Sequence, residues 1–321
     1  MKAVLLSRGR VAVVERPDPE PGPAEALIRV LVAGICGTDH ELARGYMDFE
    51  GIPGHEFVGV VEAVRSSRED EVRWSGRRVA GEINLSCGAC SRCEAGLGRH
   101  CPARSVLGII GKDGAQAERV TLPLRNLHAV PDGIPDRAAV FIEPLAAACE
   151  ILDQVEVRPQ DRVLVVGDGR LAHLAARVLL TAAGSVTMLG RHPDKLKKSE
   201  GTGIASTNDG ASLKPGYDLV VDATGSPSGL YAAARLARPR GTIVLKSTYQ
   251  GERPLPLARL VVDEVTLVGS RCGRFEAAIP LLESGSIAVA DLVSEVHPLS
   301  EAATAYERSA ARDVLKVLLE P

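Results

Sequence analysis

The sequence lacks any long hydrophobic run. Its apolar stretches stay well below the roughly 18 residues typical of a membrane-spanning helix, and the amino terminus does not resemble a signal peptide. It also lacks a dominant charge sign, because 38 basic and 41 acidic residues leave a formal net charge of −3. Without a basic stripe, nucleic-acid binding is not expected. We therefore expect a cytoplasmic chain that binds neither membrane nor nucleic acid.

Cysteines are few, and their number is odd. Seven cysteines in 321 residues fit a disulfide framework poorly, and cytoplasmic thiols stay reduced. A chain of this length also buries enough surface to fold without cross-links. Four of the seven nevertheless lie together in the stretch CGACSRCEAGLGRHC, residues 87–101. Their clustering favours a metal site over disulfides.

The clustered cysteines have the spacing C-x2-C-x2-C-x7-C and are Cys87, Cys90, Cys93 and Cys101. Four thiolates on short spacers can surround Zn²⁺ tetrahedrally, and the intervening glycines suit tight turns. Such a site leaves no coordination position open, so we expect it to be structural. An iron–sulfur cluster is the alternative, because thiolates also bind iron.

The pattern of the chain changes near residue 150. Residues 1 to about 130 contain short β-branched runs separated by Pro and Gly, as in a barrel-like β domain. Beyond residue 150, short apolar strands alternate with helical patterns, which predicts a parallel sheet covered on both faces. The helix over 170–183 is expected to end at a C-capping Gly184. The chain closes with two helices and a strand. The predicted class is α/β with two domains.

The segment VLVVGDGRLAHLAARVLL carries a dinucleotide-binding fingerprint. Gly167, Gly169 and Ala172 match G-x-G-x-x-(G/A), after a predicted strand and at the start of a predicted helix. Phosphates would lie at the helix N-terminus, where free N–H groups favour an anion. The alternative is a glycine-rich turn that binds nothing.

The end of the following strand bears on the choice of cofactor. An NAD site usually has Asp or Glu there, which binds the ribose 2′-hydroxyl. This chain has Gly190, followed by Arg191. A guanidinium can pair with a 2′-phosphate, so we expect NADP(H) to be preferred and NAD(H) to remain possible. Arg191 could otherwise be a solvated residue at a helix start.

A second group of metal-ligand residue types is spread along the chain. GICGTDHEL supplies Cys36 and GIPGHEF supplies His55 and Glu56, while VFIEPL supplies Glu143. Cysteine, histidine and carboxylate all bind zinc, and three protein ligands with one open position make a catalytic site. Each residue alone has a structural explanation. Their occurrence beside a dinucleotide fingerprint favours catalysis.

Across its whole length the chain resembles the zinc-dependent medium-chain dehydrogenase/reductase superfamily. The resemblance rests on the motifs GICGTD, GHEFVGVVE, EPL, GDGRLA and DATG and on the four-cysteine segment. It implies a GroES-like catalytic domain, residues 1–150 with a return over 272–321, and a Rossmann domain over 151–271. It also implies a homodimer or homotetramer that acts on a small alcohol, polyol or sugar.

The resemblance further implies roles for individual residues. Cys36 and His55 would bind catalytic zinc, with Glu56 or Glu143 as the third ligand. Asp39 would orient His55. Thr38 would begin a proton relay that His40 or Glu41 continues. The residues expected to contact the cofactor are Gly167, Gly169, Arg170, Leu171, Gly190, Arg191, Thr224 and Lys316.

Some positions depart from the family pattern. Gln116 stands where relatives tend to have an aromatic residue, and the segment between Cys36 and His55, part of the expected substrate wall, is short. We therefore predict hydride transfer between NADP(H) and a secondary alcohol, polyol or sugar without naming the substrate. The alternatives are a catalytically silent NADPH-binding homologue and a zinc-independent alkene reductase.

Overall fold

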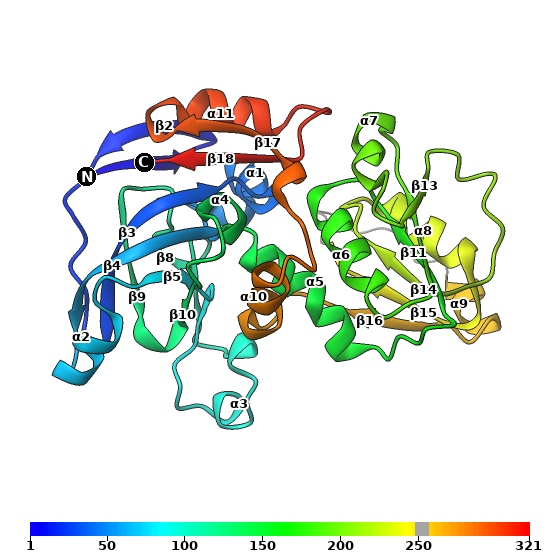
Figure 1. The fold of residues 1–321 in the computed structure, drawn as a ribbon, viewed down its shortest axis with the longest axis horizontal. Helices are drawn as coiled ribbons and strands as arrows, with labels where there is room; N and C mark the ends of the chain where they lie inside the picture. Colours follow the sequence, from blue (N-terminus) through cyan, green and yellow to red (C-terminus); the bar gives the residue numbers. More distant parts are fainter. Residues whose placement is uncertain (248–256) are drawn as a thin grey trace. The chain divides into compact units, whose positions relative to one another are not determined.

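The computed structural model describes residues 1–247 and 257–321 and divides into two units (Figure 1). Unit 1 comprises residues 1–143 and 278–321, and unit 2 comprises residues 144–277. Both boundaries lie inside helices, α5 (Ile142–Gln154) and α10 (Phe275–Glu283). The sequence analysis placed them after residues 150 and 271. A continuous helix offers no Pro- or Gly-rich linker to mark a boundary, so sequence patterns locate it only approximately.

Unit 1 contains a seven-stranded, mostly antiparallel sheet. Its order is β10-β5-β4-β3-β18-β17, and β9 also pairs with β3. The strands are β3 (Glu25–Gly34), β4 (Phe57–Arg65), β5 (Arg78–Gly81), β9 (Arg119–Pro123), β10 (Leu127–Ala129), β17 (Val293–Pro298) and β18 (Lys316–Glu320). Alternate residues of β3 are buried, as expected for a strand with one face on the core. This unit forms the β-rich domain that the sequence predicted.

The two ends of the chain fold together in unit 1. Figure 1 shows the red C-terminal strand β18 in the same body as the blue N-terminal strands, and β18 pairs antiparallel with β3 at Gly34 and Leu318. A buried cluster joins the N-terminal hairpin of β1 (Lys2–Ser7) and β2 (Arg10–Glu15) to the C-terminal helix α11 (Ala302–Ser309). Each fully buried aliphatic side chain in such a core contributes about 1.5–3 kcal/mol. The predicted C-terminal return therefore forms part of the core of unit 1.

The remaining elements of unit 1 are short. The strands are β6 (Asn84–Leu85), β7 (Ser105–Leu107) and β8 (Gly111–Lys112), which form a small sheet. The helices are α1 (Gly37–Ala43), α2 (Arg68–Trp74), α3 (Ser91–Glu94) and α4 (Asp136–Ala139), with 3-10 turns η1 (Tyr46–Asp48), η2 (Gly98–His100), η3 (Leu124–Asn126), η5 (Ala290–Leu292) and η6 (Leu299–Glu301). Five of the seven residues of α2 are charged. Its Trp74 is buried, so one face of this helix packs on the unit.

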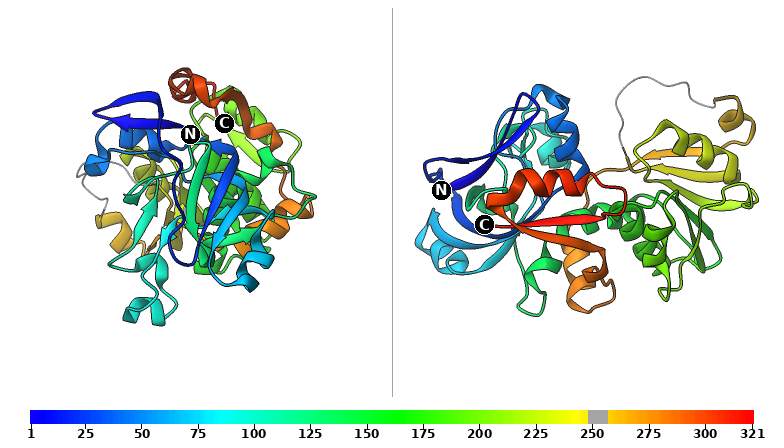
Figure 2. Two further views of the ribbon diagram at one scale, coloured as in Figure 1. Left: turned by 90° about the vertical axis from the view of Figure 1, so that its left-hand side faces the viewer. Right: turned by 90° about the horizontal axis from the view of Figure 1, so that it is seen from above.

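Unit 2 is a parallel sheet with the strand order β13-β12-β11-β14-β15-β16 among its described residues. The strands are β11 (Arg162–Val166), β12 (Ser185–Leu189), β13 (Ala205–Thr207), β14 (Tyr217–Asp222), β15 (Ala237–Leu245) and β16 (Thr266–Gly269). The helices are α6 (Arg170–Leu180), α7 (Pro193–Leu196), α8 (Pro227–Leu236) and α9 (Leu257–Val262), with a 3-10 turn η4 (Lys197–Ser199). Figure 2 shows these elements from two further directions. The order corresponds to the doubly wound dinucleotide-binding arrangement, as predicted.

Helix α6 shows one difference from the sequence prediction. It ends at Leu180 with Thr181 as its C-cap, so Gly184 is not the capping residue. A Cβ at Gly184 would collide with the carbonyl oxygen of Pro159, and close packing therefore explains this glycine. Among the described residues, none of the helices has the length and hydropathy needed to cross a membrane.

Candidate active site

Cys36 is held at the start of helix α1. Strand β3 ends at Gly34, and Cys36 is the N-cap residue of the helix. The backbone N–H of Cys36 donates to the Asp39 carboxylate, with an N···Oδ2 distance of 2.7 Å. This is the return bond of a capping box, which satisfies a free N–H at the helix start. The bond turns Asp39 inward, where its side chain is fully buried.

His55 and Glu56 reach the same place from the neighbouring strand. They immediately precede β4, whose first residue, Phe57, pairs with Ala33 near the end of β3. The backbone N–H of Gly34 donates to the carbonyl oxygen of Glu56 at 2.7 Å. The antiparallel register therefore brings His55 and Glu56, which are 19 and 20 positions further along the chain, beside Cys36.

The three side chains form a buried set of metal-ligand type. One ligand atom from each of Cys36, His55 and Glu56 lies within 4.8 Å of the others, and the two latter residues are buried. Thiolate, imidazole and carboxylate are zinc donors, and three protein ligands leave one position open. His55 Nδ1 lies 3.7 Å from Asp39 Oδ1, and neither atom has a hydrogen-bond partner among the described residues. Metal-bound histidines donate their second ring N–H to such a carboxylate, so this donor set fits a zinc ion.

Negative charge is concentrated around the imidazole. Burial by itself lowers the pKa of His55, but the charges of Cys36 and Asp39 outweigh it and raise this pKa to about 9. Glu143 adds to the same effect. Burial also raises the pKa of Asp39. An arrangement that favours a cation on the imidazole is chemically consistent with a site for a divalent metal.

The predicted role of Lys316 is not supported by its position in the structure. It was expected at the cofactor phosphates, but its ammonium is fully buried in unit 1. The ammonium forms a close ion pair with Glu56 and donates to the carbonyl oxygen of Ile35 at 3.3 Å. Burial lowers its pKa to about 8. A buried charge needs a partner, and Glu56 is that partner.

The other predicted residues of this site lie at different distances from it. Thr38 Oγ1 lies 3.9 Å from Cys36 Sγ, beside the donor set. His40 Nε2 lies 2.8 Å from Ser309 Oγ. Glu41 points to the surface and pairs with Arg44 at 2.6 Å, so its assignment to the relay is corrected. Glu143 acts on His55 electrostatically but lies outside the three-residue set, whose carboxylate is that of Glu56.

The four clustered cysteines form a second set. None of the seven cysteines forms a disulfide. The four sulfur atoms are separated by 3.5–3.9 Å in the pairs Cys87–Cys93, Cys90–Cys93, Cys90–Cys101 and Cys87–Cys101. A tetrahedron with Zn–S bonds of about 2.3 Å has edges of about 3.8 Å, so these spacings fit zinc. Gly88 and Gly96 both have φ of +76° and make the tight turns expected of the intervening glycines.

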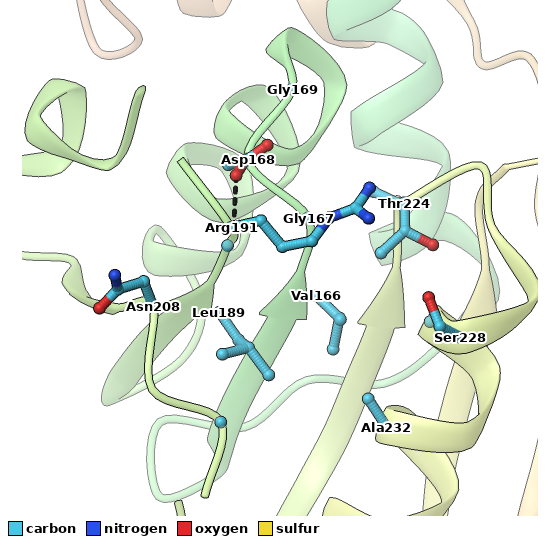
Figure 3. Close-up of a pocket in the computed structure, with 14 residues that line it drawn as sticks. Val166, Gly167, Asp168, Gly169, Leu189, Arg191, Asn208, Thr224, Ser228 and Ala232 are labelled. Carbon is cyan, nitrogen blue, oxygen red and sulfur yellow. Dashed lines mark hydrogen bonds between the residues drawn. The ribbon is translucent and has the colours of Figure 1, made fainter. Parts of the chain in front are cut away.

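The fingerprint turn lies in unit 2 (Figure 3). It borders a cavity of about 400 Å³, which is lined by Gly167, Gly169, Gly190, Arg191 and Thr224 among others. Gly167 has φ of +132°, and a Cβ there would lie 2.8 Å from the carbonyl oxygen of Ala223. Only glycine suits that position. Arg170 and Leu171 are the first two residues of α6.

Asp168, between the two glycines, is a residue that the sequence analysis missed. Its Oδ2 accepts hydrogen bonds from the backbone N–H groups of Arg191 and His192, at 2.6 and 2.7 Å. A Cβ at Gly190 would lie 2.5 Å from the Asp168 Cβ. The carboxylate of Asp168 therefore occupies the space that an acidic side chain at position 190 would need. The position of Asp168 between the two fingerprint glycines was the signal in the sequence that could have identified it.

A dinucleotide turn and a buried Cys/His/carboxylate set in one chain define a class of metal-dependent oxidoreductases. Residues 22–132 match the family model of the alcohol dehydrogenase GroES-like domain, and residues 169–284 match that of the zinc-binding dehydrogenases. The chain belongs to the zinc-dependent medium-chain dehydrogenase/reductase superfamily, as its motifs suggested. It is an enzyme of the alcohol and polyol dehydrogenase type.

Individual relatives match over the full length. The chain is 31% identical to a sorbitol dehydrogenase of Halalkalibacterium halodurans, with 100% of this chain and 99% of that protein covered. A zinc-binding dehydrogenase of Sinorhizobium meliloti bound to NADP has a TM-score of 0.91 at 30% identity, covering 100% and 99% of the two chains. An alcohol dehydrogenase (rspB) of Escherichia coli in complex with NADH has the same TM-score at 28% identity and the same coverage.

Proposed function

We propose that the chain transfers a hydride between NADP(H) and a secondary alcohol, a polyol or a sugar hydroxyl, or the corresponding carbonyl, with zinc at Cys36, His55 and Glu56. The observation that carries this proposal is the buried donor set with Asp39 beside His55. A zinc ion there would supply Lewis-acid polarisation of the substrate oxygen. A nicotinamide would exchange the hydride with the substrate carbon.

The protein's own residues have distinct tasks in this proposal. Cys36, His55 and Glu56 hold the metal, and Asp39 sets the orientation of His55. Thr38 Oγ1, beside Cys36, accepts the proton of the substrate hydroxyl and passes its own proton outward to solvent. Lys316 neutralises Glu56, which would otherwise be an unpaired buried carboxylate. The ion pair with Lys316 also gives Glu56 a second partner, so this carboxylate could alternate between the metal and the ammonium.

The preference for NADP(H) rests on Arg191. Figure 3 shows its side chain extending across the turn towards Gly167 and Thr224. Asp168, the nearest carboxylate shown, is already bonded to two backbone N–H groups and to His192 Nδ1 at 3.0 Å. In the described parts of the chain, the guanidinium of Arg191 forms no ion pair, so it is available to pair with a 2′-phosphate.

We further propose two zinc ions for each chain, one at the donor set and one at the four cysteines, and a homodimer or homotetramer in solution. The test of function is steady-state turnover of the zinc-loaded protein on a panel of secondary alcohols, polyols and sugars with each cofactor. Turnover that requires the zinc at Cys36, His55 and Glu56 supports the proposal. Tight NADPH binding without turnover of any alcohol or carbonyl would support the catalytically silent alternative.

A further inference from the structure

The carboxylate of Asp39 is held from two directions. Its Oδ2 accepts the backbone N–H of Cys36 at 2.7 Å and the side-chain amide of Gln116 at 3.2 Å. The other oxygen, Oδ1, lies 3.7 Å from His55 Nδ1 and has no hydrogen-bond partner within residues 1–247 and 257–321. Two donors on one oxygen therefore leave the second oxygen directed at the histidine.

Gln116 is enclosed by residues of the site. It is fully buried, and its Nε2 also donates to the carbonyl oxygen of Gly34 at 3.2 Å. Gly54, which precedes His55, has φ of +98°, and a Cβ there would lie 2.5 Å from the Gln116 Cγ. The glutamine thus contacts the backbone on both arms of the site, beside Cys36 and beside His55.

Tyr306 determines which way the Gln116 amide points. This tyrosine lies on α11 at the other end of the chain and is buried. Its hydroxyl donates to Gln116 Oε1 at 2.7 Å, and burial raises the pKa of the hydroxyl well above its ordinary value, so it remains a donor. With Oε1 bound to the hydroxyl, the NH₂ group faces Asp39. The reversed amide would place two oxygen atoms against each other.

We propose that Gln116 and Tyr306 are positioning residues, which hold Asp39 so that Oδ1 faces His55 Nδ1 and leaves Nε2 for the metal. A fixed carboxylate selects the tautomer of a metal-bound histidine and raises its basicity. The inference rests on the proposed zinc site at Cys36, His55 and Glu56. It adds that zinc affinity there depends on a hydrogen-bonded chain that reaches the C-terminal helix.

The test measures zinc affinity at the Cys36 site by competition with a chromophoric chelator, with Cys36→Ala identifying which zinc is followed. Gln116→Glu places a carboxylate against Asp39, and we expect it to weaken zinc binding by about 10- to 100-fold. Gln116→Met keeps the length without the amide, and we expect a loss of about tenfold. Tyr306→Phe removes a single oxygen atom, and we expect a loss of about three- to tenfold.

The matched control is Tyr217→Phe, which alters a buried tyrosine of unit 2 and should change neither zinc affinity. A second readout is the absorption spectrum of the Co²⁺-substituted protein, which responds to the ligand geometry. We expect its bands to shift in the Gln116 and Tyr306 variants but not in the control. Zinc at the four cysteines should be unaffected throughout.

The outcomes separate the two proposals. If wild type binds two zinc ions and the folded Gln116→Met and Tyr306→Phe variants keep both the affinity and the cobalt spectrum, the positioning role is wrong and the zinc site stands. If wild type binds zinc only at the four cysteines, the proposed function fails and the positioning role fails with it. Tyr306→Phe decides the matter if the Gln116 variants do not fold.

Discussion

The two cysteine-containing sites differ in how the chain builds them. The four-cysteine set comes from one stretch of fifteen residues, and only Cys101 is buried. The donor set of Cys36, His55 and Glu56 is assembled by the pairing of β3 with β4, and it depends on Lys316 from the last strand. The first site is conspicuous in the sequence but leaves no position open for a substrate. The second is dispersed, buried and chemically open.

The contrast predicts that the two sites fail in different ways. Loss of a cysteine from the four-cysteine set should destabilise residues 87–101, because a structural metal contributes folding free energy directly. Damage to the dispersed set should stop the reaction while most of the fold persists. Four substitutions test this contrast, in order of decreasing expected effect.

Cys36→Ser should abolish turnover. Loss of a ligand from the open site removes the metal's contribution to catalysis, which is several kcal/mol, so kcat/KM should fall by more than about a thousandfold. Steady-state kinetics and the melting temperature are the measurements. A variant that keeps more than a tenth of wild-type activity would contradict the assignment of this site as catalytic.

Lys316→Met should destabilise unit 1. In the zinc-free protein, removing one partner of this buried ion pair leaves Glu56 uncompensated and typically costs about 3–5 kcal/mol. Urea unfolding measures this free energy, and NADPH titration of the folded variant measures cofactor affinity. We expect the affinity to be unchanged. A weaker NADPH complex with normal stability would restore the phosphate-binding role that the structure removes from Lys316.

Cys90→Ser should lower the melting temperature and expose residues 87–101 to proteases. We expect a loss of a few kcal/mol in the lobe from the missing structural metal. Turnover per folded chain should stay within about twofold of wild type, because this set has no open coordination position. Cys149→Ser, which changes a buried cysteine outside both sets, is the control for loss of a thiol. An inactive but stable Cys90→Ser protein would break the contrast.

Arg191→Ala extends the comparison to unit 2, where the cofactor turn is also formed by a local motif. A hydrogen bond between charged groups is worth about 1.5–3 kcal/mol, so NADPH should bind about 10- to 100-fold more weakly. NADH binding should be unchanged because it lacks the 2′-phosphate. Fluorescence titration of the variant with NADPH and with NADH measures both affinities. Equal weakening for both would place Arg191 on a part of the cofactor common to the two.

Local motifs made most of the fold and the four-cysteine set predictable. The fingerprint glycines, the cysteine spacing and the alternation of strands with helices each act within about thirty residues. Contacts between distant residues were not accessible in this way. Gln116 contacts Asp39 across 77 positions, and Tyr306 contacts Gln116 across 190. Lys316 was assigned to the phosphates from the family resemblance. Its partner in the structure, Glu56, is 260 positions away, and no local pattern connects them.

The central claim is that each chain has two zinc sites and that the dispersed one is catalytic. The most direct measurement is the zinc content per folded chain of wild type and of Cys36→Ala, by elemental analysis after desalting. We predict two zinc ions in wild type and one in the variant, with circular dichroism unchanged. One zinc in both proteins, or loss of both in the variant, would contradict the claim.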